Sequence, residues 1–194
     1  MNVYDFDHTV YRGDSSIDFA AFCLKRHPLL FIYLPVQLSA RIAIFLGLLS
    51  ARRRKEIFFA FLSLYPAAPR EIEEFWRSCA NKISPWYLAR QRSTDCIISA
   101  SPDFLLRPLV SGRWGVRLIA TDMSPDSAKI EGGNCKGREK VSRFSTCCPN
   151  EEIDEFYSDS LSDAPLARIA KRAFLINLKG GGPPEIHPWP DRSR

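Results

Sequence analysis

Short apolar runs that end in polar residues alternate along the chain with segments of helical periodicity. Short runs rich in β-branched and aromatic residues are typical of buried strands. Such runs lie at residues 2–6, 95–101, 115–123, 153–160 and 173–178, and residues 128–137 have the pattern of a strand and turn. Apolar periodicity with N-cap and proline signals predicts helices at residues 15–27, 51–65, 68–83, 102–114, 138–145 and 162–172.

This order of elements predicts an α/β fold with a Rossmann-like core, in which helices flank both faces of a parallel sheet. The helices between the first two strands have the position of an insertion. We therefore expect a core domain of residues 1–13 and 94–178 and a helical cap domain of residues 14–93. Residues 179–194 are rich in Gly and Pro, which predicts a loosely ordered tail.

Composition excludes few classes of function. Of the 194 residues, 45% are hydrophobic and 25% are charged, which is typical of a globular protein. The net charge of +5 favours anionic partners, but the aromatic residues are not interleaved with basic ones as in nucleic-acid-binding proteins. The six Cys contain no CxxC motif and the three His are scattered, which argues against a zinc site.

Polar side chains lie where the predicted strands end. Asp5 and Asp7 close the first strand, Ser99 the second and Asp159 the fourth. Ligands of parallel sheets bind at the carboxyl ends of the strands, so these residues are expected to meet there. Carboxylates at positions i and i+2 point the same way and repel each other unless a cation such as Mg²⁺ lies between them. The alternative is that the two Asp only end a strand and cap a turn.

Four short motifs in the sequence resemble those of a known protein family. The stretch DFDHT resembles the DxDxT motif of haloacid dehalogenase (HAD) superfamily phosphatases, and IISAS resembles their second motif. NCKGREKV resembles the lysine-bearing third motif and YSDSLSD the acidic fourth. The four occur in the expected order, and the helical insertion resembles the cap of the phosphoserine phosphatase-like branch, subclass IB. The resemblance implies a HAD-type phosphatase that hydrolyses a phosphomonoester with Mg²⁺ as cofactor.

The resemblance also implies a role for each matching residue. Asp5 would be the nucleophile and a metal ligand, and Asp7 would be the general acid and base and would give the metal its backbone carbonyl. The other expected roles are metal binding by Asp159 and Asp163, phosphoryl binding by Ser99 with the backbone of Ala100 and Ser101 nearby, loop stabilisation by Thr9, and substrate contact by Asp14.

The motif lysine has two candidates. Lys136 and Lys140 are one helical turn apart and share a helix face. The C-x-G-x-E-K pattern of similar sequences selects Lys140, whereas the pattern of phosphoserine phosphatases selects Lys136. We expect Lys140 to be the catalytic lysine and keep Lys136 as a substrate-binding candidate.

The cap carries the most apolar run of the chain, residues 28–49, followed by the basic run Arg52, Arg53, Arg54 and Lys55. Apolar helices with adjacent basic residues can lie in the interface of an anionic membrane. The cap resembles that of HAD-type bacterial phosphatidylglycerophosphatases, which implies a lipid phosphate as substrate. The alternative is that these are ordinary core helices of a cap for a small soluble substrate such as phosphoserine.

Two further alternatives concern activity itself. The same fold could serve a non-catalytic binding protein or a membrane-surface adaptor. The chain begins with a charged strand and shows no signal peptide, so we expect a cytoplasmic protein that reaches the inner face of the membrane if its cap contacts lipid.

Overall fold

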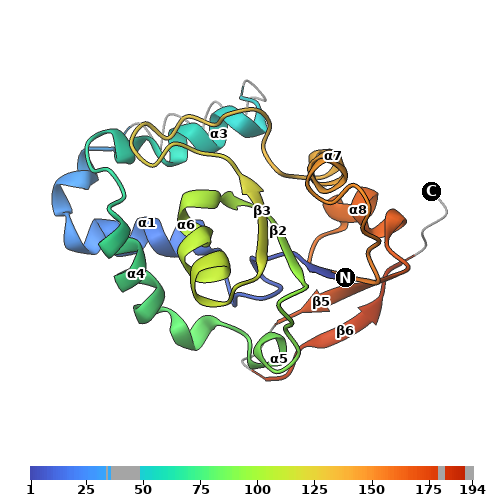
Figure 1. Cartoon of the computed structure of the whole chain (residues 1–194). Helices are drawn as coiled ribbons and strands as arrows, with labels where there is room; N and C mark the ends of the chain where they lie inside the picture. The colour runs from blue at the N-terminus through green and yellow to red at the C-terminus, as the bar shows by residue number, and fades with distance from the viewer. Residues whose placement is uncertain (34, 36–48, 179–181, 191–194) are drawn as a thin grey trace.

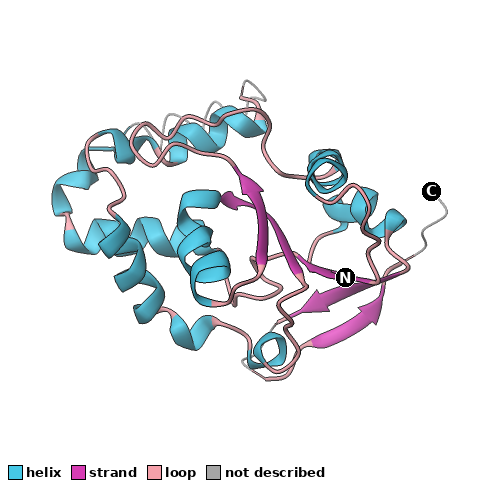
Figure 2. Cartoon of the chain, in the orientation of Figure 1, coloured by secondary structure: helices cyan, strands magenta, loops and turns pink. Residues whose placement is uncertain are grey.

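The computed structural model describes residues 1–33, 35, 49–178 and 182–190, in which six strands form one sheet (Figures 1 and 2). The strands are β1 (Asn2–Tyr4), β2 (Cys96–Pro102), β3 (Arg117–Thr121), β4 (Glu155–Ser158), β5 (Arg172–Asn177) and β6 (Glu185–Pro188). Their order is β3-β2-β1-β4-β5-β6. The strands β1 to β5 pair in parallel and β6 pairs antiparallel to β5. The predicted α/β fold class is therefore confirmed.

The helical segment between β1 and β2 is the insertion expected from the sequence. It contains α1 (Ser15–Arg26), η1 (Pro28–Tyr33), α3 (Ala51–Phe58), η2 (Ala60–Ser63), α4 (Pro69–Ser78), η3 (Ala80–Lys82) and α5 (Pro85–Leu88). Asp14 caps α1 by accepting a hydrogen bond from the backbone N–H of Ile17 at 3.0 Å. The division of the chain into core and cap domains stays a prediction.

Helices cover both faces of the sheet. After β2 come α6 (Asp103–Arg107) and the wider helical turn η4 (Pro108–Arg113); α7 (Arg138–Cys147), η5 (Leu161–Asp163) and α8 (Ala164–Ile169) follow later. In Figure 1, α1, α4 and α6 lie on one side of the strands and α7 and α8 on the other. Strand side chains alternate between two buried clusters in the way that a period of two requires. Tyr4 and Ile97 join the cluster of the insertion, and Val3 and Cys96 join that of α7 and α8.

Two predicted elements differ from the structure. Residues 128–137 were expected to form a strand and turn, but they form a loop that meets the preceding chain in a single bridge between Met123 and Ile130. The prediction of a loosely ordered tail is wrong for Glu185–Pro188, which forms β6. The ladder between β6 and β5 explains this difference, since pairing with a strand supplies hydrogen bonds that a Gly/Pro-rich composition does not reveal.

The apolar run at residues 28–49 lies mostly outside the described residues. Among the helices that are described, none is long and apolar enough to cross a membrane.

Candidate active site

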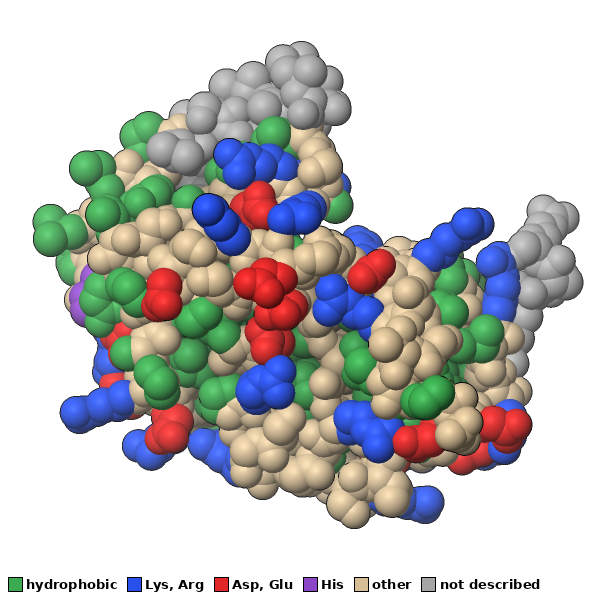
Figure 3. Space-filling model, turned by 45° about the horizontal axis from the view of Figure 1, so that its top comes forward, with side chains coloured by type: hydrophobic (Ala, Val, Ile, Leu, Met, Phe, Trp, Pro, Cys, Tyr) green, Lys and Arg blue, Asp and Glu red, His purple; other side chains and the backbone are tan. Residues whose placement is uncertain are grey.

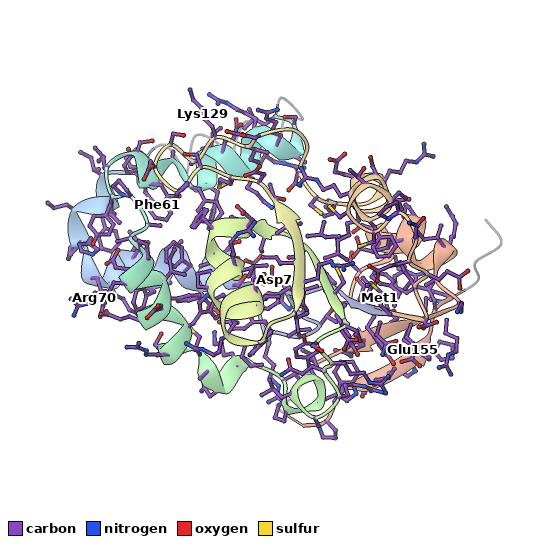
Figure 4. The ribbon with its side chains drawn as sticks, viewed as in Figure 1. Met1, Asp7, Phe61, Arg70, Lys129 and Glu155 are labelled. Atoms are coloured by element: carbon purple, nitrogen blue, oxygen red, sulfur yellow. The ribbon has the colours of Figure 1, made fainter. Side chains whose placement is uncertain are left out.

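The carboxyl ends of three neighbouring strands bring the predicted acidic and hydroxyl side chains together. Asp5 directly follows β1, and its backbone N–H donates to the Tyr157 carbonyl of β4 at 2.8 Å. Ser99 is the fourth of the seven residues of β2, and Asp159 follows β4. In Figure 4, Asp7 lies between α6 and β3 in the view, apart from Met1 and Glu155. The structure therefore brings these candidate residues to the carboxyl end of the sheet.

Lys140 joins two carboxylates from different elements. Its Nζ atom lies 2.8 Å from Asp5 Oδ1 and 2.6 Å from Asp163 Oδ2. Its side chain is only 2% exposed, and Ser158 Oγ donates a further hydrogen bond to Asp163 at 2.9 Å. Lys136, the other lysine candidate, is exposed. The structure thus brings Lys140 to the acidic group and leaves Lys136 outside it.

A left-handed glycine makes this placement of Lys140 possible. Gly137 precedes α7 and has a φ of 60°, which residues with a side chain adopt only with strain. The backbone N–H of Lys140 donates to the Gly137 carbonyl at 3.2 Å. The turn therefore directs the first turn of α7, with Lys140, toward the strand ends.

One ammonium group faces more than one negative charge in this cluster. Burial raises the pKa of Asp5, Lys140 opposes this rise, and the nearby Asp163 and Asp159 charges add to it. Burial also raises the pKa of Asp159. Burial lowers the pKa of Lys140, but Asp5 and Asp163 outweigh that effect and hold it above its ordinary value. The cluster carries an excess of negative charge that a further cation would balance.

Asp7 is held through both of its carboxylate oxygens. The backbone N–H of Ser15 donates to Oδ1 at 2.7 Å, and the Ser101 hydroxyl donates to Oδ2 at 2.5 Å. The chain leaves the site through a tight turn in which His8 has a φ of 56° and its N–H donates to the Gly13 carbonyl at 3.1 Å. The geometry gives Asp7 a fixed orientation next to the second motif.

The remaining predicted residues occupy less direct positions. Ser99 is buried, and its hydroxyl oxygen accepts from the Ser101 N–H at 3.0 Å. Thr9 is buried in the turn after Asp7, and its hydroxyl has no hydrogen-bond partner among the described residues. The side chain of Asp14 caps α1, so its expected contact with substrate would compete with this cap.

Lys55 is a residue at the site that the sequence analysis did not assign to it. Its ammonium group, carried by α3, donates to the Ala100 carbonyl and, at 2.9 Å, to Asn134 Oδ1. Burial lowers the pKa of Lys55 to about 8, and the charges of Asp7 and Asp14 oppose this shift. Only its place in the helical register of a basic run could have suggested that this lysine faces inward.

The basic run of α3 is therefore divided between two environments. The guanidinium group of Arg52 donates to the Ile130 carbonyl at 2.6 Å and to the Gly132 carbonyl at 3.0 Å. Lys55 therefore turns toward the site, whereas Arg52 makes these contacts with its side chain still 51% exposed, because one helix cannot direct four consecutive side chains to the same side. Contact of the basic run with lipid headgroups stays a prediction. Arg53 and Arg54 remain exposed.

The donor chemistry of the cluster fits Mg²⁺ in part. Asp5 and Asp159 offer carboxylate oxygens, which Mg²⁺ prefers, and burial is the main cause of their raised pKa values. Asp163 is already engaged by Lys140 and Ser158. Within the described part of the chain, no three acidic, His or Cys side chains form a group that could hold a metal. Mg²⁺ is commonly held by one or two carboxylates with a backbone carbonyl and waters.

The fold and this cluster define a class of protein. The chain matches the haloacid dehalogenase-like hydrolase family over residues 3–168, and it belongs to that family. The predicted membership of this superfamily is confirmed. No curated protein matches the chain significantly.

Solved structures share the fold. A protein of unknown function from Bordetella pertussis Tohama I is 23% identical, with a TM-score of 0.69 over 89% of this chain and 87% of that one. A probable phosphoserine phosphatase from Vibrio cholerae is 9% identical, with a TM-score of 0.61 over 89% of this chain and 55% of that one. A phosphoserine phosphatase, solved as an analogue of its phospho-aspartyl intermediate, is 15% identical. Its TM-score is 0.54 over 88% of this chain and 83% of that one. At these identities the likeness establishes the fold alone.

Proposed function

We propose that the protein is a Mg²⁺-dependent phosphomonoester hydrolase that works through an aspartyl-phosphate on Asp5. The observation that carries this proposal is the bridge from Lys140 to Asp5 and Asp163 at the carboxyl ends of the strands. A buried lysine beside a carboxylate neutralises charge where an anionic phosphoryl group would approach. The family membership of the chain and its phosphatase structural neighbours support the same reaction.

The reaction divides into two displacements at phosphorus. An Asp5 oxygen attacks phosphorus while the bond to the leaving oxygen breaks, and Asp7 gives that oxygen its proton. Water then attacks the phosphorus of the aspartyl-phosphate and transfers a proton to Asp7, which releases inorganic phosphate and restores Asp5. Lys140 balances the charge of the phosphoryl oxygens, and the buried Ser99 hydroxyl can donate to one of them.

Asp5, Asp159 and the backbone carbonyl of Asp7 would hold the metal. Asp163 would support these ligands through its hydrogen bond with Lys140. When bound, Mg²⁺ would supply charge neutralisation and orientation of the phosphoryl oxygens.

We propose a lipid phosphate, such as phosphatidylglycerophosphate, as the substrate class. Leu29, Phe31 and Ile32 of η1 are 89%, 53% and 71% exposed, and Arg54 is exposed on α3. Figure 3 shows hydrophobic side chains gathered at the end of the molecule that the insertion forms. Exposed apolar side chains near basic ones favour an anionic lipid surface. A small soluble phosphomonoester such as phosphoserine is the second candidate, which the phosphoserine phosphatase neighbours favour.

Phosphate release by the purified protein tests the reaction. The substrates are phosphatidylglycerophosphate in mixed micelles, phosphoserine and p-nitrophenyl phosphate, each with and without Mg²⁺. We expect turnover that requires Mg²⁺ and that Asp5→Asn abolishes, while the exposed control Asp126→Asn keeps wild-type activity. Full activity of Asp5→Asn would refute the aspartyl-phosphate mechanism. A folded wild-type protein without turnover on any substrate would favour a binding protein.

The same assay separates the two substrate classes. The double variant Leu29→Asp/Ile32→Asp should lose activity on the lipid in micelles and keep it on soluble phosphates. Ile169→Asp is the matched control, because Ile169 is 50% exposed on α8, away from the insertion. An equal effect of both variants on the lipid would refute the proposed role of η1.

A further inference from the structure

We propose that Ser101 is a positioning residue that orients the Asp7 carboxylate for proton transfer to the leaving oxygen; this inference rests on the proposed function. The Ser101 hydroxyl donates to Asp7 Oδ2 at 2.5 Å across a sequence separation of 94 residues. Ser101 is 3% exposed, so water does not compete freely for this contact. The proposal differs from the backbone role expected for Ser101, because it assigns the function to the side chain.

Three elements determine where the Ser101 hydroxyl lies. The Ser101 N–H donates to Ser99 Oγ at 3.0 Å, which fixes the end of β2. Its hydroxyl oxygen lies 3.2 Å from Ser16 Oγ and 3.4 Å from Ser15 Oγ, both in the first turn of α1. A carboxylate oxygen has no proton to give, so the Ser101 proton points at Asp7 and its lone pairs face α1. Ser101 thus connects β2 and α1 to the turn after β1.

The two donors of Asp7 are not equivalent. The Ser15 N–H can only donate, so it keeps Oδ1 as an acceptor. A serine hydroxyl can rotate between donor and acceptor roles, so the contact to Oδ2 survives when that oxygen carries a proton. The contact to Oδ2 therefore keeps the carboxyl group of Asp7 in one orientation in both of its protonation states. This arrangement suits a group that alternates between acid and base.

The dependence of rate on the leaving group tests this role. A p-nitrophenolate leaves with little help from an acid, whereas the alkoxide of an alkyl phosphate needs a proton. We expect Ser101→Ala to lower kcat/KM for an alkyl phosphate about tenfold more than kcat/KM for p-nitrophenyl phosphate, because well-oriented general acids contribute roughly 10²–10⁴-fold. The ratio of kcat/KM for the two substrates is the readout, since a general loss of structure lowers both values equally.

Three further variants keep the test decisive. Ser101→Thr keeps the hydroxyl and should restore the ratio, and Ser101→Cys keeps the shape with a weak donor and should lower it even if Ser101→Ala folds poorly. Ser84→Ala is the matched control, because Ser84 is also buried but its hydroxyl has no partner among the described residues. An unchanged ratio in Ser101→Ala and Ser101→Cys would overturn the proposal. Wild-type protein without turnover on both substrates would instead overturn the proposed function itself.

Discussion

Lys140 is the single residue on which the charge balance of the site depends. Replacing it with Met leaves Asp5 and Asp163 buried without their shared counter-charge. Because breaking a buried ion pair from one side costs about 3–5 kcal/mol, we expect the free energy of unfolding of Lys140→Met to fall by about that amount at pH 7. Urea denaturation followed by circular dichroism measures the change.

A second variant separates this charge effect from lost packing. In Lys140→Met/Asp163→Asn one of the two orphaned charges is removed, so the double variant should be more stable than Lys140→Met alone. A double variant that is less stable than the single one would mean that the carboxylate charges do not cause the loss.

At the level of single residues, the sequence predicts local motifs but not contacts between distant segments. Asp5 and Ser99 are predicted because each belongs to a local motif at a predicted strand end, and Lys140 because it belongs to the lysine-bearing motif at the start of a predicted helix. The contacts of Ser101 with Asp7 and of Lys55 with Ala100 join residues 94 and 45 positions apart. The periodicity of apolar residues and the spacing of motifs cannot predict such a contact, because it depends on how α1 and α3 pack against β2.

The strand β6 contributes to the stability of the core, although the Gly/Pro-rich composition of its segment does not indicate this. Trp189 directly follows β6, is 8% exposed, packs against Phe156 with ring centroids 6.0 Å apart, and donates its backbone N–H to the Ala173 carbonyl at 2.9 Å. Since truncating a buried aromatic residue costs about 3–5 kcal/mol, we expect Trp189→Ala to lower the free energy of unfolding by about 3 kcal/mol. Thermal and urea unfolding measure the loss.

The matched control for Trp189 is His187→Ala in the same segment. His187 is exposed, so its replacement should change stability by less than about 0.5 kcal/mol. If Trp189→Ala were as stable as this control, the segment after residue 181 would contribute nothing to the core.

Elements differed in how well the sequence predicted them. The strands β1, β2 and β4 are mostly buried between helices, and their apolar runs predicted them. The strand β6 is short, mostly exposed and contains Pro188, so it lacks that signal. The loop at 128–137 has strand-like residues but pairs only through one bridge, because Arg52, Glu56 and Arg143 take up its backbone groups instead.

At the scale of the whole molecule, the insertion and the sheet are connected by charged side chains of α3. Arg52 holds the loop that follows β3, and Lys55 reaches the end of β2. Both contacts use backbone carbonyls as acceptors. A lysine that is largely buried with carbonyl and amide partners keeps its proton less readily than one beside a carboxylate, which makes this connection sensitive to pH.

The direction of this sensitivity follows from the pKa of Lys55, which burial lowers to about 8 from an unfolded value of about 10.4. Between about pH 8 and pH 10.4 the unfolded chain binds the proton that the folded protein has released, so this residue makes stability rise with pH in that window. We expect the free energy of unfolding of the wild type, minus that of Lys55→Met, to increase from pH 8 to pH 10. The difference cancels the titration of the cysteines, which both proteins share.

Arg54→Met is the control for this measurement, because it removes an exposed positive charge from the same helix without changing a group that titrates below pH 12. Its difference from the wild type should stay flat over the same range. A flat difference for Lys55→Met as well would mean that Lys55 keeps an ordinary pKa, and its ammonium group would then be solvated rather than held between α3 and the end of β2. A rising difference would establish that the insertion packs onto the sheet in solution, since only that packing removes Lys55 from water.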